Sequence, residues 1–148
     1  MPFEELLKEV DTLAAKGLFG EPVVCQGGQS RYRLSHGTQF VTRASISDLI
    51  DESSMVITHG GATVLQLLIA HKPFVAFPNP RGAGDHQTSF LATVATVSNI
   101  SWSQNVTDLE ALFQERRLLG PARVSSRIPR AADIIRNALL PLRLMTVR

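Results

Sequence analysis

The stretch from residue 55 to residue 78 constrains the fold of this chain more than any other. An apolar run over 55–58 ends at the sequence His-Gly-Gly, and a helical pattern of apolar residues over 63–70 follows at once. A Lys-Pro pair then leads into a second apolar run over 74–77. Short apolar runs that alternate with a helical segment are typical of a parallel sheet with crossover helices. The stretch therefore predicts a strand, a glycine turn, a helix and a second strand.

The glycine turn is suited to a ligand that carries phosphate. Gly60 and Gly61 have no Cβ, so the backbone can approach a bound group closely. The turn also precedes a predicted helix, whose free N–H groups and dipole favour an anion. Its spacing is neither G-x-G-x-x-G nor that of a Walker loop, so the ordinary dinucleotide and P-loop fingerprints are absent. We therefore expect a different phosphate-bearing ligand at this turn.

A second polar cluster, Asp85-His86-Gln87, follows the next predicted strand. A loop over 79–84 rich in proline and glycine precedes it, and an apolar helical pattern resumes after it. Asp85 suits a helix N-cap, with His86 and Gln87 in the first turn. One interpretation is a capping aspartate beside two solvated residues; the other is hydrogen bonding to sugar hydroxyls. Loops that follow consecutive parallel strands open at the same sheet edge, so we expect this cluster near the glycine turn.

The remaining segments continue the alternation of strands and helices. Ser45 and Thr107 are expected to cap two of the helices. Strands are expected over 22–25, 39–42, 55–58, 74–77 and 98–102, and helices over 4–16, 46–50, 63–70, 88–97, 108–118 and 130–142. The alternation predicts an α/β fold with a Rossmann-like, mostly parallel sheet flanked by helices. We expect one domain over 1–148, whose segment 127–148 is helical and either covers the sheet or faces a membrane or partner.

Composition excludes several classes of protein. The chain has 148 residues, 44% of them hydrophobic and 19% charged, which is ordinary for one globular domain. A net charge of +2 does not indicate nucleic-acid binding. The single cysteine, Cys25, excludes an internal disulfide and is interpreted as core packing. No stretch is long enough to span a bilayer and no signal peptide opens the chain, so we expect a cytoplasmic protein.

These residues together resemble a known family. The pattern of strand, His-Gly-Gly, helix, Lys-Pro, strand and Asp-His-Gln is similar to the nucleotide-sugar-binding, C-terminal domain of GT-B glycosyltransferases of the family 28 type. The resemblance starts at Pro2-Phe3-Glu4-Glu5-Leu6, continues through Val24-Cys-Gln-Gly-Gly28 and Ser30-Arg-Tyr32, and runs to about Val97. Within the family, the chain resembles the stand-alone catalytic subunit of dolichol-linked chitobiose synthase and the small subunits of bacterial polysaccharide glycosyltransferases. The resemblance implies a hexosyltransferase subunit that passes a hexose or N-acetylhexosamine from a UDP-sugar to a lipid-linked or polysaccharide acceptor.

The resemblance also implies a donor site. The turn over 60–63 would hold the diphosphate. Gln66, at a position where the family usually has Glu, would hold the ribose. Asp85 and Gln87 would hold the hydroxyls of the donor sugar. The residues expected to bind the nucleotide or the donor sugar are Gly27, Gly28, His59, Gly60, Gly61, Ala62, Thr63, Gln66, Asp85, His86 and Gln87. No Asp-x-Asp pair is present, so no metal and no cofactor are expected beside the UDP-sugar substrate. The general base is unassigned; we interpret His59 and His86, the two candidates, as hydrogen-bonding or structural residues.

The resemblance further implies a partner. Family members begin with an interior strand that ends in Gly-Thr, just before the Pro-Phe segment, and this strand is not found here; a misplaced start, a truncation and a real variant all remain open. Half of the cleft is also missing. We therefore expect a membrane-anchored, acceptor-binding subunit or a second copy of the chain, peripheral to the cytoplasmic face of the membrane. The alternatives are a non-catalytic, regulatory nucleotide-sugar-binding subunit and a GT-B epimerase, although an epimerase needs two such domains.

Overall fold

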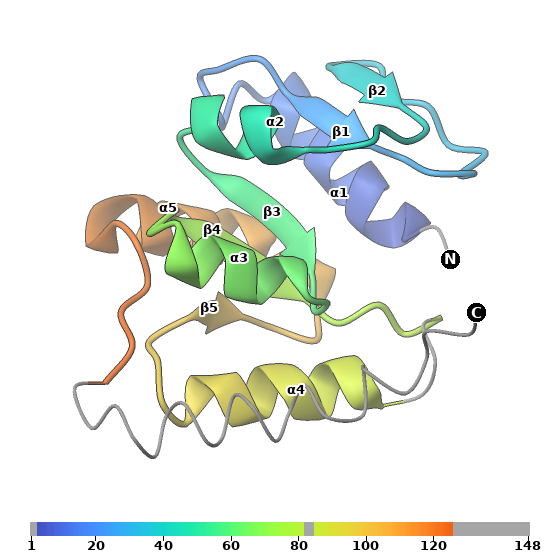
Figure 1. Cartoon of the computed structure of the whole chain (residues 1–148). Helices are drawn as coiled ribbons and strands as arrows, with labels where there is room; N and C mark the ends of the chain where they lie inside the picture. The colour runs from blue at the N-terminus through green and yellow to red at the C-terminus, as the bar shows by residue number, and fades with distance from the viewer. Residues whose placement is uncertain (1–2, 82–84, 126–148) are drawn as a thin grey trace.

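The computed structural model of the chain describes residues 3–81 and 85–125, in which strands and helices alternate (Figure 1). In chain order the elements are α1 (Glu4–Ala15), β1 (Val24–Gln26), β2 (Thr38–Phe40), α2 (Ser47–Glu52), β3 (Val56–His59), α3 (Thr63–Ile69), β4 (Phe74–Phe77), α4 (His86–Ala95), β5 (Ser101–Trp102), the 3₁₀ turn η1 (Val106–Asp108) and α5 (Leu109–Leu119). This order confirms the predicted α/β fold. The helix expected over 130–142 and the segment 127–148 lie outside the described residues.

All strand pairs in the described part of the chain are parallel, as predicted, but they form two sheets. β1 pairs with β2, while β3, β4 and β5 form a separate sheet with β4 in the middle. In Figure 1, β1 and β3 run in the same direction, and β1 lies with β2, α1 and α2 on one side of β3. The edges of β1 and β3 that face away from β2 and β4 have no strand partner among the described residues.

β4 is the centre of the hydrophobic core, because all four of its residues are fully buried. Side chains of successive strand residues point to opposite faces of the sheet. Phe74 and Ala76 accordingly pack with residues of α2, α3 and α4, whereas Val75 and Phe77 pack with residues of α1 and α5. A strand covered by helices on both faces is a continuous apolar run in the sequence, which explains why the bounds of this strand were predicted correctly.

The structure corrects some predicted boundaries and both predicted caps. Strand β1 starts later than the expected range 22–25, and β5 contains only the last two residues of the range 98–102. Thr107 is not the cap of α5: its amide donates to Asn105 Oδ1 at 3.2 Å, which opens η1, and α5 begins at Leu109. Ser45 is not the N-cap of α2 either, because α2 begins at Ser47 and Ile46 occupies the N-cap position; the Ser45 hydroxyl accepts from the Ser47 amide at 3.1 Å from one residue further back. These changes leave the order of the elements unaltered.

A buried arginine ties α5 to β5. The Arg116 side chain is only 1% exposed, and its guanidinium donates to Ser101 Oγ at 2.8 and 3.0 Å, to the Gly120 carbonyl at 3.2 Å and to the Asn99 carbonyl. Desolvation lowers its pKa. Buried charges require hydrogen-bonding partners, and the five donors of a guanidinium allow one side chain to bond several acceptors. Arg116 therefore fixes the loop before β5 against the end of α5.

A buried carboxylate ties the loop over 30–37 to α1. Asp11 accepts hydrogen bonds from the Tyr32 hydroxyl at 2.7 Å, the Ser35 amide at 3.0 Å and the His36 amide at 2.8 Å. Burial on its own would raise the pKa of Asp11, but the hydrogen bonds from Ser35, Tyr32 and His36 outweigh it and lower the pKa to about 2. The ionised carboxylate is therefore the form that holds the loop.

This pKa predicts acid sensitivity. A carboxyl whose pKa is lower in the folded state contributes stability that is complete above its unfolded pKa and is lost on acidification. The contribution of Asp11 should therefore disappear as the pH falls from about 3.8 towards about 2. At neutral pH, Asp11→Asn should lower the free energy of unfolding by about 2 kcal/mol. Urea denaturation at a series of pH values measures both effects.

The matched control is Asp51→Asn, which changes an exposed aspartate in the last turn of α2. This variant should lose stability on acidification as the wild type does, whereas Asp11→Asn should lose less. An equal loss in the wild type and in Asp11→Asn would show that Asp11 does not anchor the loop.

Candidate functional site

The turn after β3 lies at the carboxyl edge of the three-stranded sheet. His59 pairs with Phe77, so β3 and β4 end level with each other. The Gly60 amide donates to the Phe77 carbonyl at 3.0 Å, and the Gly61 amide donates to the His59 carbonyl at 2.7 Å. Helix α3 begins two residues later. The strand, glycine turn and helix predicted from the sequence are therefore present.

Gly60 is a glycine because helix α4 approaches it closely. A Cβ at this position would lie 2.8 Å from Leu91 Cδ1, 3.0 Å from Leu91 Cγ and 3.3 Å from Gln87 Cβ. At Gly61 a Cβ would lie 3.0 Å from His59 Cε1. The space beside each glycine is thus occupied by protein, so a side chain at either position would meet a neighbouring side chain.

The same contacts bring the two predicted polar clusters together. Gln87 lies in the first turn of α4 and meets Gly60, so the Asp-His-Gln cluster reaches the glycine turn. Its Oε1 accepts from the Asn79 amide at 2.8 Å, and the Asn79 side chain accepts from the Arg81 amide at 3.0 Å. Gln87 therefore also fixes the loop that follows β4.

The side chains of Asp85 and His86 are exposed. Asp85 occupies the predicted N-cap position of α4, but its carboxylate makes no capping hydrogen bond. The side chain of Gln66 is likewise exposed, and it lies one turn after Thr63 on the same face of α3. Three of the predicted polar side chains thus face solvent near the end of β3 or at the start of α4.

His59 sits at the end of β3 with its ring against Gly61. Although part of the residue is exposed, desolvation by the surrounding protein lowers its pKa. The neutral imidazole therefore dominates at neutral pH and can donate one hydrogen bond and accept another.

Gly27 and Gly28 form a turn at the carboxyl end of β1, in the other sheet. The Gly27 amide donates to the Phe40 carbonyl at 2.9 Å, and its carbonyl accepts from the Ser30 amide at 3.1 Å. Gly28 has a φ of 55°, which only glycine adopts at little cost. A Cβ at Gly27 would lie 2.0 Å from Gln39 Nε2, so the Gln39 side chain packs directly against this turn.

Two residues, one beside the site and one at the opposite edge of the sheet, have roles that the sequence did not predict. Asn79 is 4% exposed, and its side chain organises the loop after β4; a polar residue between two prolines directly after a buried strand was the available signal. Lys72 was considered in the sequence only as part of the Lys-Pro pair that precedes β4. Its ammonium group donates to the Asp51 carbonyl at 2.6 Å and to the Ser53 carbonyl at 3.0 Å. Lys72 therefore caps the carboxyl end of α2.

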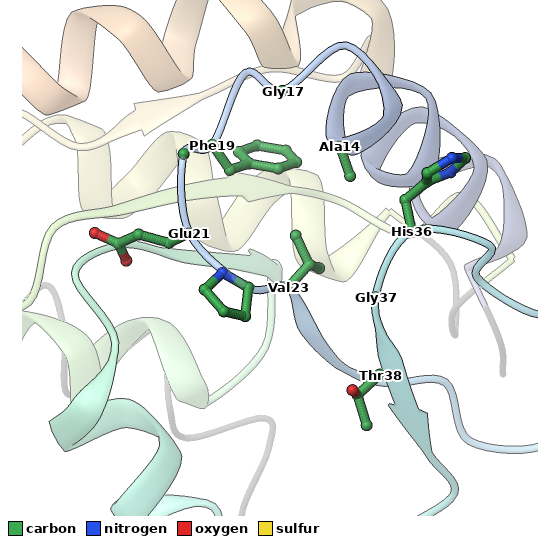
Figure 2. Close-up of a pocket in the computed structure, with 10 residues that line it drawn as sticks. Ala14, Gly17, Phe19, Glu21, Val23, His36, Gly37 and Thr38 are labelled. Carbon is green, nitrogen blue, oxygen red and sulfur yellow. The ribbon is translucent and has the colours of Figure 1, made fainter.

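A cavity of about 490 Å³ lies elsewhere, at the amino ends of β1 and β2. Figure 2 shows Phe19, Val23 and His36 around it, with Ala14 of α1 on one side. Its lining includes none of the predicted site residues. The predicted site residues lie at or after the carboxyl ends of the strands, whereas the cavity is lined at the amino ends of β1 and β2.

None of the described helices is both long and apolar enough to cross a membrane. In residues 3–81 and 85–125, no three His, Cys, Asp or Glu side chains are grouped as a metal ion would require.

The close approach of α4 to β3 predicts the effect of Gly60→Ala. The added methyl group meets Leu91, which is fully buried and cannot move into solvent. Overpacking of this kind should lower the free energy of unfolding by about 1–3 kcal/mol. In the background of Leu91→Ala, which removes the clashing atoms, the same substitution should cost close to nothing. Urea denaturation of the four proteins measures the coupling, and additive effects would contradict the contact.

Comparison with known proteins agrees with this geometry. The family model of the glycosyltransferase family 28 C-terminal domain matches residues 19–115, which is well over half of the chain. The matched range includes both glycine turns and the Asp-His-Gln cluster. No curated protein and no solved structure gives a significant match. The chain therefore belongs to the glycosyltransferase family 28 C-terminal domain family, and its function is of the glycosyltransferase type.

Proposed function

We propose that the chain is the donor-binding subunit of a glycosyltransferase that uses a UDP-sugar. It would transfer a hexose or an N-acetylhexosamine to a lipid-linked or polysaccharide acceptor, at the cytoplasmic face of a membrane. The observation that carries the proposal is the contact between Gly60 and Gln87, which joins the two polar clusters within the family match. A ligand at this edge can meet the backbone of one cluster and the side chains of the other.

The turn before α3 is the proposed place of the donor diphosphate. The amides of Ala62 and Thr63 have no acceptor among the described residues, so they can donate to phosphate oxygens. Donors of this kind stabilise the negative charge that develops on the leaving diphosphate, without a metal ion. Gln66, on the same face of α3 as Thr63, would then reach the ribose hydroxyls.

The first turn of α4 is the proposed place of the donor sugar. The exposed side chains of Asp85 and His86 can bond to sugar hydroxyls. The Oε1 of Gln87 is already used by the Asn79 amide, which leaves the Nε2 group of Gln87 for the sugar. The neutral imidazole of His59 would donate or accept a hydrogen bond beside the diphosphate, and the general base would come from the partner.

A second candidate function is a nucleotide-sugar-binding subunit without catalytic activity. The observation that favours it is Gln66, because a neutral amide accepts hydrogen bonds more weakly than the carboxylate usual in the family. The two functions differ in one measurable way: only the catalytic subunit transfers sugar when an acceptor-binding partner is present.

UDP should bind without a divalent metal, and a negative charge at Gly61 should prevent it. The control for Gly61→Asp is Gly61→Asn, which has the same size and meets the His59 ring equally but carries no charge. Repulsion between the carboxylate and the diphosphate should weaken binding by about tenfold or more relative to Gly61→Asn. Titration calorimetry in the presence of a chelator measures both affinities. Equal dissociation constants for the two variants would place the diphosphate elsewhere.

The assembly of the subunit is proposed from the two free strand edges. Val23, Cys25 and Gly27 face β2, since the Val23 carbonyl and the Gly27 amide bond to it. The backbone groups of Val24 and Gln26 therefore point away from β2, because successive residues of a strand alternate. Exposed strand edges readily pair with another chain. We expect a second copy of the chain or an acceptor-binding partner to pair there.

Val24→Pro tests this edge. Proline removes a backbone N–H, and at Val24 that group points away from the β1–β2 ladder, so the sheet should survive. The wild type should sediment as a dimer or with its partner, and Val24→Pro as a monomer. The control is Cys25→Pro, which should disrupt the sheet and unfold the region. A wild-type chain that is a stable monomer and transfers sugar unaided would rule out the subunit interpretation.

A further inference from the structure

The two glycine turns belong to different sheets, yet the first turn of α1 contacts a loop at the carboxyl end of each sheet. One carboxylate oxygen of Glu4 accepts from the Ser30 hydroxyl at 3.1 Å and from the Arg31 amide at 3.0 Å. The neighbouring Glu5 lies 4.0 Å from the Arg81 guanidinium. Ser30 and Arg31 follow β1, whereas Arg81 follows β4. The start of α1 is therefore a bridge between the two halves of the carboxyl edge.

On the β1 side, Glu4 closes the turn that begins at Gly27. Ser30 is 2% exposed, and its amide donates to the Gly27 carbonyl at 3.1 Å. Its hydroxyl donates to Glu4 and accepts from the Tyr32 amide at 3.1 Å. Hydrogen bonds to an ionised carboxylate are stronger than neutral ones. Without Glu4, the buried Ser30 hydroxyl and the Arg31 amide would lose their acceptor.

On the β4 side, the contacts continue to the other glycine turn. The Arg81 amide donates to the Asn79 side chain, and the Asn79 amide donates to Gln87, which lies against Gly60. The hydrogen bonds from the Arg31 amide and the Ser30 hydroxyl lower the pKa of Glu4, and the charge of Arg81 makes a smaller contribution in the same direction. The Arg81 guanidinium thus lies near Glu5, while the Arg81 amide belongs to the hydrogen-bonded loop that reaches the turn at Gly60.

Glu4 itself is not suited to be a ligand of a diphosphate. Its charge would repel phosphate, and the oxygen that faces the loop already accepts two hydrogen bonds. The effect of Glu4 on a ligand must therefore pass through the residues that it holds.

We propose that Glu4 is a positioning residue for the nucleotide-sugar donor: it holds the turn from Gly27 to Arg31 in the shape that contacts the donor, level with the turn at Gly60. This inference rests on the proposed function. The donor class is a nucleoside diphosphate sugar, whose two ends would meet the two turns. The guanidinium of Arg31, which has no hydrogen-bond or ion-pair partner among the described residues, is then held at the edge where an anionic donor binds.

The test compares UDP binding by the full chain and four variants in titration calorimetry with a chelator. Glu4→Ala should weaken UDP binding by about tenfold, because the turn loses its anchor. Glu4→Gln keeps an acceptor oxygen at the same place and should restore most of the affinity. Glu21→Ala is the matched control: Glu21 accepts from the Ser54 hydroxyl at 2.7 Å, but both residues precede their strands at the opposite edge of the sheets. This variant should bind UDP like the wild type.

Ser30→Ala is the fourth variant, and it keeps the test decisive if Glu4→Ala does not fold. Loss of its hydroxyl should weaken UDP binding and speed hydrogen exchange of the Arg31 amide, with little change in the thermal midpoint. If Glu4→Ala binds UDP as tightly as the wild type, the proposed role of Glu4 is wrong. If Glu4→Ala is unfolded, unchanged UDP affinity in Ser30→Ala has the same meaning. Equal losses of affinity in Glu4→Ala and Glu21→Ala also overturn the role. A wild-type chain that does not bind UDP overturns the proposed function itself, and this inference with it.

Discussion

The burial of β4 on both faces is the constraint on which the rest of the structure depends. Its four residues are fully buried, two against α2, α3 and α4 and two against α1 and α5. Burying large apolar side chains contributes about 1.5–3 kcal/mol each, so the two phenylalanines and the valine of this strand contribute substantially to the stability of the fold. Because β3 and β5 pair with β4 in fixed register, the strand also sets where the turn after β3 and the loop before α4 emerge.

The candidate site combines this rigid centre with side chains that hold the surrounding loops. Gly60 lets α4 pack against the end of β3, and Gln87 then fixes Asn79. Glu4 and Asp11, both on α1, hold the loop that follows β1. The two turns of the proposed site are therefore held by contacts from other segments, whereas the exposed side chains of Gln66, Asp85 and His86 are placed by α3 and by the start of α4. Such support is what a site needs if it is to bind a flexible, charged donor in one orientation.

Features that depend on a local pattern of residues were predicted from the sequence, whereas features that depend on backbone geometry or on distant contacts were not. β4 was predicted with its correct bounds because a strand buried on both faces leaves an uninterrupted apolar run. Thr107 was wrongly predicted as a helix cap because threonine and asparagine are both good caps, and only the backbone geometry of η1 selects Asn105. The roles of Asn79 and Lys72 were not predicted because their partners lie in segments that are distant or irregular in sequence.

The sequence by itself determined the alternation of strands and helices, the parallel sheet and the family, because periodicity and local motifs are properties of neighbouring residues. It also determined that a glycine turn and an Asp-His-Gln cluster follow consecutive strands. Only the tertiary structure decided that the strands divide into two sheets and that Gly60 accommodates Leu91 rather than open space. It alone placed Glu4 between two loops. These features are contacts between segments far apart in the chain, and no local pattern of residues specifies which distant groups will meet.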